Sequence, residues 1–198
     1  MRVLGLTGGI ATGKSTASRY IAKRGIPVID ADQVARDICA PNSPTLNTLV
    51  NNFGDILLPS GELNRAALRH IVFSDPSARK RLESITHPAI FSELKRLIFL
   101  EKTRGKAAAV VDAALMVETG SYTQYDALIV ISCDPNTQKD RLIARDMLTQ
   151  DQAQAIIEAQ LPLSEKEAKA DFLIMNDGTP DDLFEAINSA WPALFPAS

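Results

Sequence analysis

The sequence is poor in cysteine, and its two thiols stand far apart. Cys39 and Cys133 are the only cysteines among 198 residues. Neither belongs to a CxxC pair or to a Cys/His spacing of the kind that binds zinc. We therefore expect two ordinary buried or half-buried thiols, and neither a disulfide scaffold nor a zinc site.

The sequence also lacks an excess of charge of either sign. Its 21 Lys and Arg residues against 24 Asp and Glu residues leave a formal net charge of −3. Proteins that wrap nucleic acid usually carry a broad basic face, so we expect no nucleic-acid partner. The balance still leaves room for a local basic cleft that binds an anionic small molecule.

Long hydrophobic runs are missing as well. No stretch approaches the roughly 20 apolar residues that cross a bilayer. The chain passes from Met1-Arg2 directly into a short apolar segment, without the features of a signal peptide. We therefore expect a cytoplasmic protein with no membrane partner. With 45 % hydrophobic and 23 % charged residues, the composition is that of a folded domain, which excludes disorder over most of the chain.

What the sequence does contain is an alternation of short apolar runs and helical patterns. Such runs, separated by helices, predict a parallel sheet that is buried on both faces. The predicted strands are residues 3–6, 28–29, 107–111, 127–131 and 172–175. The helical patterns cover residues 14–23, 63–73, 89–100, 137–160 and 181–190. The helical stretch 31–102 is typical of an insertion between strands. The helical stretch after the fourth strand is typical of a second, smaller insertion.

The sharpest motif is a phosphate loop, which we define as residues 8–15. Its sequence, Gly8-Gly9-Ile10-Ala11-Thr12-Gly13-Lys14-Ser15, fits the Walker A pattern G-x-x-x-x-G-K-[ST]. Glycines let successive N–H groups turn toward a phosphate, and the start of the following helix adds a positive dipole end. Lys14 can reach the β- and γ-phosphates, and the Ser15 hydroxyl can join a Mg²⁺ shell. A glycine-rich turn without a ligand is the alternative, and the strand–loop–helix context disfavours it.

Carboxylates follow two of the predicted strands. Asp30 and Asp32 come at the end of the second strand, and their side chains point the same way if that strand continues. Ligands of open parallel sheets bind beyond the carboxyl ends of the strands, so either residue is a candidate base for an acceptor hydroxyl. The alternative is a helix N-cap. Asp112 lies at the end of the third strand, which is the position of a Walker B acid that holds Mg²⁺. Glu118 is either a site residue or a surface carboxylate.

Basic residues supply further candidates. Arg141 and Arg145 are four residues apart on a predicted helix and therefore share a face. Arginines on a closing lid stabilise the charge that develops in phosphoryl transfer, and a solvated helix face is the equally weighted alternative. Arg65 is a candidate for holding a substrate phosphate. His87 precedes Pro88, which predicts a rigid turn, although a lone histidine is more often structural.

These motifs together give the chain a resemblance to the dephospho-coenzyme A kinase family, over nearly its whole length. The segments that carry the resemblance are residues 5–16, Asp30-Ala31-Asp32, residues 61–65, 71–73 and 82–88, Gln138 with Arg141 and Arg145, Gln160, Ala170-Asp171 and Asn176-Asp177-Gly178.

The resemblance implies a P-loop NTPase fold of the α/β class, with a five-stranded parallel sheet flanked by helices. It implies a core of residues 1–30, 105–133 and 170–198, a helical substrate-binding subdomain of residues 31–104 and a small helical lid of residues 134–169. The implied reaction transfers the γ-phosphoryl group of ATP to the ribose 3′-hydroxyl of dephospho-coenzyme A, the last step of coenzyme A synthesis. The partners are these small molecules with Mg²⁺, and we expect a monomer or weak homo-oligomer.

Motifs and resemblance together predict the site. Catalysis is assigned to Asp32, as the presumed base, with Lys14 and Arg141. Residues that bind the acceptor are Asp32, Arg65, His87 and Glu118, and those that hold the metal are Ser15 and Asp112. Residues that bind ATP are Gly8, Gly9, Ile10, Ala11, Thr12, Gly13, Lys14, Ser15, Thr16, Arg145 and Asn176.

The chain departs from the family pattern in two places. Ala11-Thr12 stands where the family usually has Gly-Ser, and because both residues are small we expect binding to survive. Where the family usually has Asp-Val-Pro-Leu-Leu-Phe-Glu, this chain has Asp112-Ala113-Ala114-Leu115-Met116-Val117-Glu118. The loss of proline frees the backbone and the loss of the aromatic ring leaves space, while we expect the two acids to keep their roles.

Two other functions are compatible with a phosphate loop. The same core supports kinases of other small hydroxyl compounds or of nucleoside monophosphates. A nucleotide switch of the GTPase type is disfavoured, because the sequence has no Asn-Lys-x-Asp segment to recognise guanine and no Asp-x-x-Gly segment to couple a switch loop to the γ-phosphate.

Overall fold

A computed structural model describes residues 1–196 of the chain. These residues form two compact units, one built from residues 1–29 together with residue 101 onward, the other from residues 30–100. The first unit holds a sheet and the second is helical. The finer division into core, substrate subdomain and lid stays a prediction.

The first unit is organised around a parallel sheet in the order β2-β3-β1-β4-β5. In register, Leu6 of β1 lies opposite Asp112 of β3 on one side and Ile129 of β4 on the other. The predicted five-stranded parallel sheet is confirmed. Its strands are β1 (Arg2–Gly8), β2 (Val28–Asp30), β3 (Ala108–Asp112), β4 (Ala127–Ser132) and β5 (Phe172–Met175).

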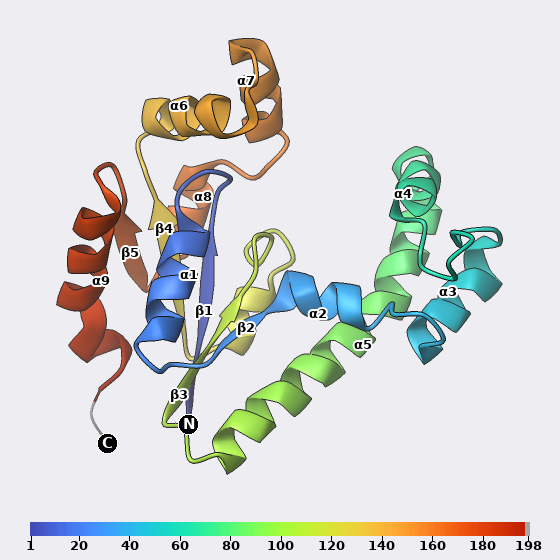
Figure 1. Cartoon of the computed structure of the whole chain (residues 1–198), viewed down its shortest axis with the longest axis horizontal. Helices are drawn as coiled ribbons and strands as arrows, with labels where there is room; N and C mark the ends of the chain where they lie inside the picture. The colour runs from blue at the N-terminus through green and yellow to red at the C-terminus, as the bar shows by residue number, and fades with distance from the viewer. Residues whose placement is uncertain (197–198) are drawn as a thin grey trace. The chain divides into compact units, whose positions relative to one another are not determined.

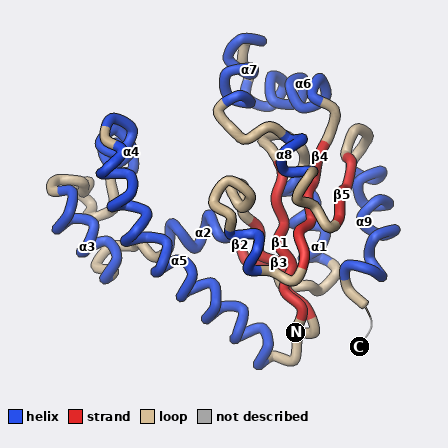
Figure 2. Tube along the Cα trace, turned by 180° about the vertical axis from the view of Figure 1, so that it is seen from behind, coloured by secondary structure: helices blue, strands red, loops and turns tan. Residues whose placement is uncertain are grey.

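The central strands are continuous apolar runs because both of their faces are covered. Every residue of β3 and β4 is buried, as expected for the middle of a parallel sheet. Helices α1 (Lys14–Lys23) and α9 (Pro180–Leu194) contact each other and pack on one face (Figures 1 and 2). Tyr20 of α1 stacks on Phe184 of α9 with ring centroids 4.2 Å apart. The apolar core of this unit joins the sheet to these two helices.

Between β4 and β5 the chain forms three helices where the sequence predicts one long helical stretch over residues 137–160. They are α6 (Pro135–Asp146), α7 (Gln150–Glu158) and α8 (Leu163–Glu167). The predicted stretch breaks because Met147 adopts a left-handed backbone with φ 53° and Thr149 then caps α7 with its side chain. Figure 1 shows α6 and α7 beyond the carboxyl end of the sheet. A short 3₁₀ turn, η1 (Ser121–Gln124), lies before β4.

The second unit is helical, as predicted for the insertion. Its helices are α2 (Ala31–Asp37), α3 (Pro44–Phe53), α4 (Arg65–Ser74) and α5 (Pro76–Thr103), the last of which runs three residues past the boundary. Leu46, Leu49, Ile56 and Leu68 form its own apolar core. The only extended pairing among its residues is one bridge between Leu57 and Leu63.

One local expectation in this unit is wrong, and one question that the sequence left open is decided. His87-Pro88 does not form a turn but lies inside α5, where a proline removes one backbone hydrogen bond and the long helix continues on both sides. The second strand does not continue to Asp32. It ends at Asp30, whose carboxylate accepts a hydrogen bond from the Gln33 N–H at 2.8 Å and caps α2. Strand alternation therefore does not relate Asp30 to Asp32.

The cysteines agree with the sequence. Cys39 and Cys133 are free and buried, and burial raises the pKa of the Cys133 thiol to about 11. None of the helices described for residues 1–196 is both long and apolar enough to cross a membrane.

Candidate active site

The buried polar side chains of the first unit gather at one edge of its sheet. Thr7 lies near the end of β1, and Asp112 and Ser132 are the last residues of β3 and β4. Because parallel strands end at the same edge, these side chains share it. Polar groups are costly to bury without partners, so their concentration marks this edge as the place where the fold is built for a ligand. The full set is Thr7, Thr12, Asp112, Ser132, Gln138, Lys166 and Asn176.

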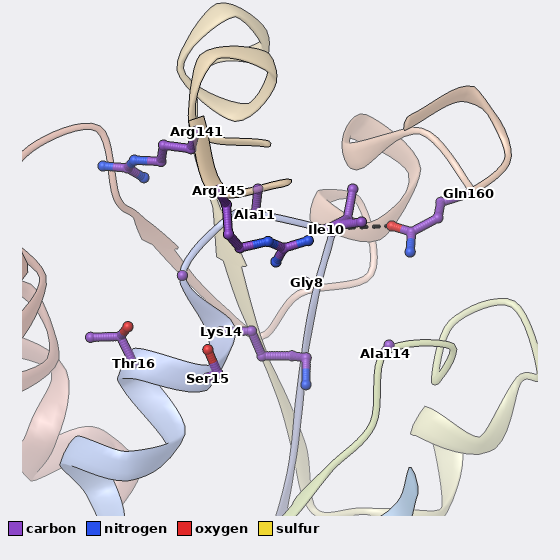
Figure 3. A pocket seen from close by; sticks show the side chains of 12 residues that line it. Gly8, Ile10, Ala11, Lys14, Ser15, Thr16, Ala114, Arg141, Arg145 and Gln160 are labelled. Carbon is purple, nitrogen blue, oxygen red and sulfur yellow. Dashed lines mark hydrogen bonds between the residues drawn. The ribbon is translucent and has the colours of Figure 1, made fainter. Parts of the chain in front are cut away.

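A pocket of about 390 Å³ opens at this edge around the phosphate loop (Figure 3). Of residues 8–16, all but Thr12 line it. The Thr12 side chain instead turns inward, where it is fully buried and its hydroxyl donates to the Gly9 carbonyl at 2.9 Å. The loop needs unusual backbone angles, with φ 60° at Ala11 and φ 92° at Gly13. Its curl therefore depends on glycine at Gly13 and is strained at Ala11.

Three side-chain amides hold the loop from outside. The Asn176 amide donates to the Thr12 carbonyl at 2.8 Å. The Gln138 amide donates to the Ile10 carbonyl at 2.8 Å, and the Gln160 amide oxygen accepts from the Ile10 N–H at 2.9 Å. The loop is thus fixed by residues more than a hundred positions away in the sequence. Gln138 and Gln160 stand out in the sequence only through the family resemblance, because no local spacing indicates these contacts.

An ion pair lies beside the loop. The Lys14 ammonium donates to a carboxylate oxygen of Asp112, and both side chains are largely buried, at 18 % and 8 % exposure. Asp112 reaches this place because β3 ends there, next to β1. The structure therefore brings together the two residues that the Walker A and Walker B patterns indicate.

The two predicted arginines both lie on α6 and both line the pocket. Their head groups nevertheless diverge, because Arg145 points toward the middle of the pocket and Arg141 points away from it (Figure 3). Arg141 donates to the carbonyls of Asn176 at 2.6 Å and Gly178 at 2.7 Å. Arg145 pairs with its neighbour Asp146 at 2.8 Å, and this hydrogen bond lowers the pKa of the Asp146 carboxyl. Arg141 therefore fixes the turn after β5, while Arg145 directs its charge at the pocket.

Lys166 is a buried cation that the sequence reasoning missed. Its side chain, on α8, is 0 % exposed and its ammonium donates to Glu118 at 2.6 Å and to the Ala114 carbonyl at 2.9 Å. Glu118, which the sequence leaves open between a site and a surface role, is thus an ion-paired residue with 21 % exposure. No local signal could reveal Lys166, since its partners lie about fifty residues earlier in the chain.

The remaining predicted site residues belong to the second unit. Asp32 lies in the first turn of α2. Arg65 begins α4, and its guanidinium donates to the Arg36 carbonyl at 3.5 Å, the long end of the hydrogen-bond range. His87 is exposed on α5 with its ring edge toward Phe91 at 6.4 Å between centroids.

Comparison with known proteins gives a consistent result. The family model described as dephospho-CoA kinase matches residues 2–182. A dephospho-CoA kinase of Geobacter sulfurreducens is 46 % identical, over 99 % of this chain and 100 % of that protein. One of Anaeromyxobacter dehalogenans is 44 % identical, over 92 % and 87 %.

A solved structure agrees with these sequence matches. The dephospho-CoA kinase of Campylobacter jejuni superposes with a TM-score of 0.73 at 29 % identity, covering 98 % of either chain. The phosphate loop, the acid at the end of β3 and the arginines of α6 thus stand in a chain that matches this family along almost its whole length. We conclude that the chain belongs to the dephospho-CoA kinase family.

Proposed function

We propose that this protein transfers the γ-phosphoryl group of ATP to the ribose 3′-hydroxyl of dephospho-coenzyme A, giving coenzyme A and ADP. The observation that carries the proposal is the phosphate-loop pocket, which Lys14, Arg141 and Arg145 line and where Lys14 pairs with Asp112, in a chain of this family. These three cations outnumber the paired carboxylates of Asp112 and Asp146, and the excess of positive charge suits a polyphosphate better than a neutral ligand.

The phosphate loop is the donor site in this proposal. Its N–H groups and the start of α1 receive the β- and γ-phosphates, and Lys14 exchanges Asp112 for phosphate oxygens. Arg145 already faces the pocket and stabilises charge on the transferred group. Arg141 and Asn176 support the turn 176–178, which we assign to the adenine end of ATP.

The chemistry is an in-line displacement. The 3′-oxygen forms a bond to the γ-phosphorus while the bond from that phosphorus to the β–γ bridging oxygen breaks, and its electron pair leaves with ADP. Asp32 orients the hydroxyl and accepts its proton. Arg65, His87 and Glu118 are assigned to the acceptor. Exclusion of water protects ATP from hydrolysis.

The residues at the pocket fit Mg²⁺. Its preferred ligands are oxygens, and when it is bound with a nucleotide it takes only one or two of them from protein, the rest from phosphate and water. Ser15 and Asp112 supply a hydroxyl and a carboxylate beside the phosphate loop. When bound, the ion neutralises charge on the β- and γ-phosphates.

The setting of the reaction is part of the same proposal. We assign the protein to the cytoplasm, as a monomer or weak homo-oligomer. Two free, buried thiols are in keeping with a reducing compartment.

The test is a mass-spectrometric assay with MgATP and a panel of acceptors: dephospho-coenzyme A, adenosine monophosphate, cytidine monophosphate and shikimate. We expect one added phosphoryl group on dephospho-coenzyme A alone. Coenzyme A is the matched control, because its 3′-oxygen already carries a phosphate. Transfer to another member of the panel in place of dephospho-coenzyme A would refute the acceptor and retain the kinase.

A further inference from the structure

The turn that follows β3 forms part of the pocket wall. We call residues 113–120 the Walker B turn. Ala114 lines the phosphate pocket, and the turn begins directly after Asp112. This is also where the sequence departs from the family pattern, since Ala114 stands in place of the usual proline. Without the ring, its φ angle is not fixed by covalent structure.

Lys166 holds both ends of this turn. Its ammonium donates to the Ala114 carbonyl at 2.9 Å near the start and to Glu118 at 2.6 Å near the end. The Thr7 hydroxyl of β1 donates to the same Ala114 carbonyl at 3.2 Å. One backbone carbonyl therefore receives two side-chain hydrogen bonds from two different elements.

The helix that carries Lys166 is itself fixed to the sheet. The neighbouring Glu167 accepts a hydrogen bond from the buried Ser132 hydroxyl, at the end of β4, at 2.5 Å. A fully buried ammonium is costly unless its partners are well placed. The position of Lys166 is thus determined on both sides, and it connects β4 through α8 to the Walker B turn.

We propose that Lys166 is a positioning residue for phosphoryl transfer. Its ammonium clamps the Walker B turn and takes over the rigidity that a proline at position 114 provides. The proposal rests on the function proposed above. It predicts that Lys166 acts on the placement of Ala114 and Asp112, and so on turnover, rather than on the phosphate loop.

Lys166→Met tests the clamp, because methionine keeps the apolar stem and removes the ammonium. We expect kcat to fall at least about tenfold, since misplacement by about 1 Å costs up to about a hundredfold. The KM for ATP should stay within about twofold, because the phosphate loop and its amides are untouched. Lys169→Met is the matched control, an exposed lysine three residues on, and should leave kcat unchanged.

A rescue variant separates positioning from general stability. When Ala114→Pro is added to Lys166→Met, kcat should rise at least about threefold above that of Lys166→Met alone, because proline restricts the backbone of the turn covalently. A proline at position 114 would break no hydrogen bond, since within residues 1–196 the Ala114 N–H donates none, and the φ angle of Ala114 is not left-handed. If Lys166 had only a structural role, Lys166→Met would lower the melting temperature but would not change the kcat of the folded fraction. Ala114→Pro would then have no loss of kcat to restore.

Amide hydrogen exchange gives a readout that does not depend on activity. In Lys166→Met, the amides of Thr119 and Gly120, which donate to carbonyls within the turn, should exchange at least about tenfold faster while β1 and β4 are unchanged. In the wild type these two amides should exchange more slowly than the turn 58–61, which has a comparable Gly61–Leu58 hydrogen bond of 2.9 Å and no clamp. Fast exchange of these two amides in the wild type would overturn the clamp even if the variant does not fold.

The outcomes are distinct. Unchanged kcat in Lys166→Met, failure of Ala114→Pro to rescue, or fast wild-type exchange of the Thr119 and Gly120 amides would each overturn the clamp. A wild-type enzyme that fails to phosphorylate dephospho-coenzyme A would instead refute the proposed function, and the exchange data would still decide on the clamp.

Discussion

Gly13→Ala tests how tightly the phosphate loop is built. Gly13 has φ 92°, and a Cβ placed there would overlap the side-chain amide nitrogen of Asn176. That nitrogen donates to the Thr12 carbonyl. Gly25 offers a matched control, because its φ is 88° and a Cβ there would meet nothing within 4 Å. The two substitutions share the backbone strain and differ in the overlap.

The expected magnitudes follow from these two terms. A left-handed backbone costs an L-residue roughly 1–2 kcal/mol, so Gly25→Ala should lower the free energy of unfolding by that amount. Gly13→Ala should lower the free energy of unfolding by roughly 1–3 kcal/mol more than Gly25→Ala does, because displacing the buried Asn176 amide leaves polar groups without partners. At about 2–4 °C per kcal/mol for a chain of this size, melting should fall by about 2–8 °C in Gly25→Ala and by about 4–20 °C in Gly13→Ala.

The assay combines urea unfolding, followed by circular dichroism, with calorimetric titration of MgATP. We expect Gly25→Ala to bind ATP as the wild type does, and Gly13→Ala to bind it at least about tenfold more weakly, because the loop curl is lost. Equal losses of stability in the two variants, or normal ATP binding by Gly13→Ala, would refute the reasoning.

Two further predictions concern turnover and alkaline stability. Asp32→Asn should lower kcat by about 10²–10⁴ with ATP binding intact. Asp30→Asn, which keeps an N-cap, should have a kcat within about threefold of the wild type. Wild-type turnover in Asp32→Asn would rule out Asp32 as the base. Burial raises the pKa of Cys133 to about 11 and of Tyr125 to about 12. The unfolded chain then loses these protons first, so stability is lost as pH rises from about 9 toward 12. Urea midpoints at about pH 7 and pH 10 measure this, and an equal midpoint at both would contradict it.

Much of the first unit could be predicted because its signals are local. An apolar run followed by a glycine loop and a helix is contiguous in the sequence, and it formed β1, the phosphate loop and α1 as predicted. Asp112 was indicated by its place at the end of an apolar run. Both inferences use only the residues next to the site.

The parts that escaped prediction depend on distant partners or on competing local geometry. Lys166 looks like any helical lysine until the fold brings Glu118 and Ala114 to it. Pro88 was expected to interrupt the backbone, yet the surrounding helix of 28 residues tolerates it. Asp30 was open between a base and a helix N-cap, and it caps α2 because the Gln33 N–H lies within reach.

The one-sided distribution of buried polar groups has a consequence for engineering this enzyme. The opposite halves of the strands are packed with apolar side chains such as Leu4, Val110 and Leu128, which carry no part of the proposed chemistry. Libraries that repack those halves can raise heat tolerance without redesigning the reaction. Libraries aimed at the carboxyl edge can change nucleotide binding while the apolar halves preserve the fold. The molecule thus offers two nearly independent targets for laboratory evolution.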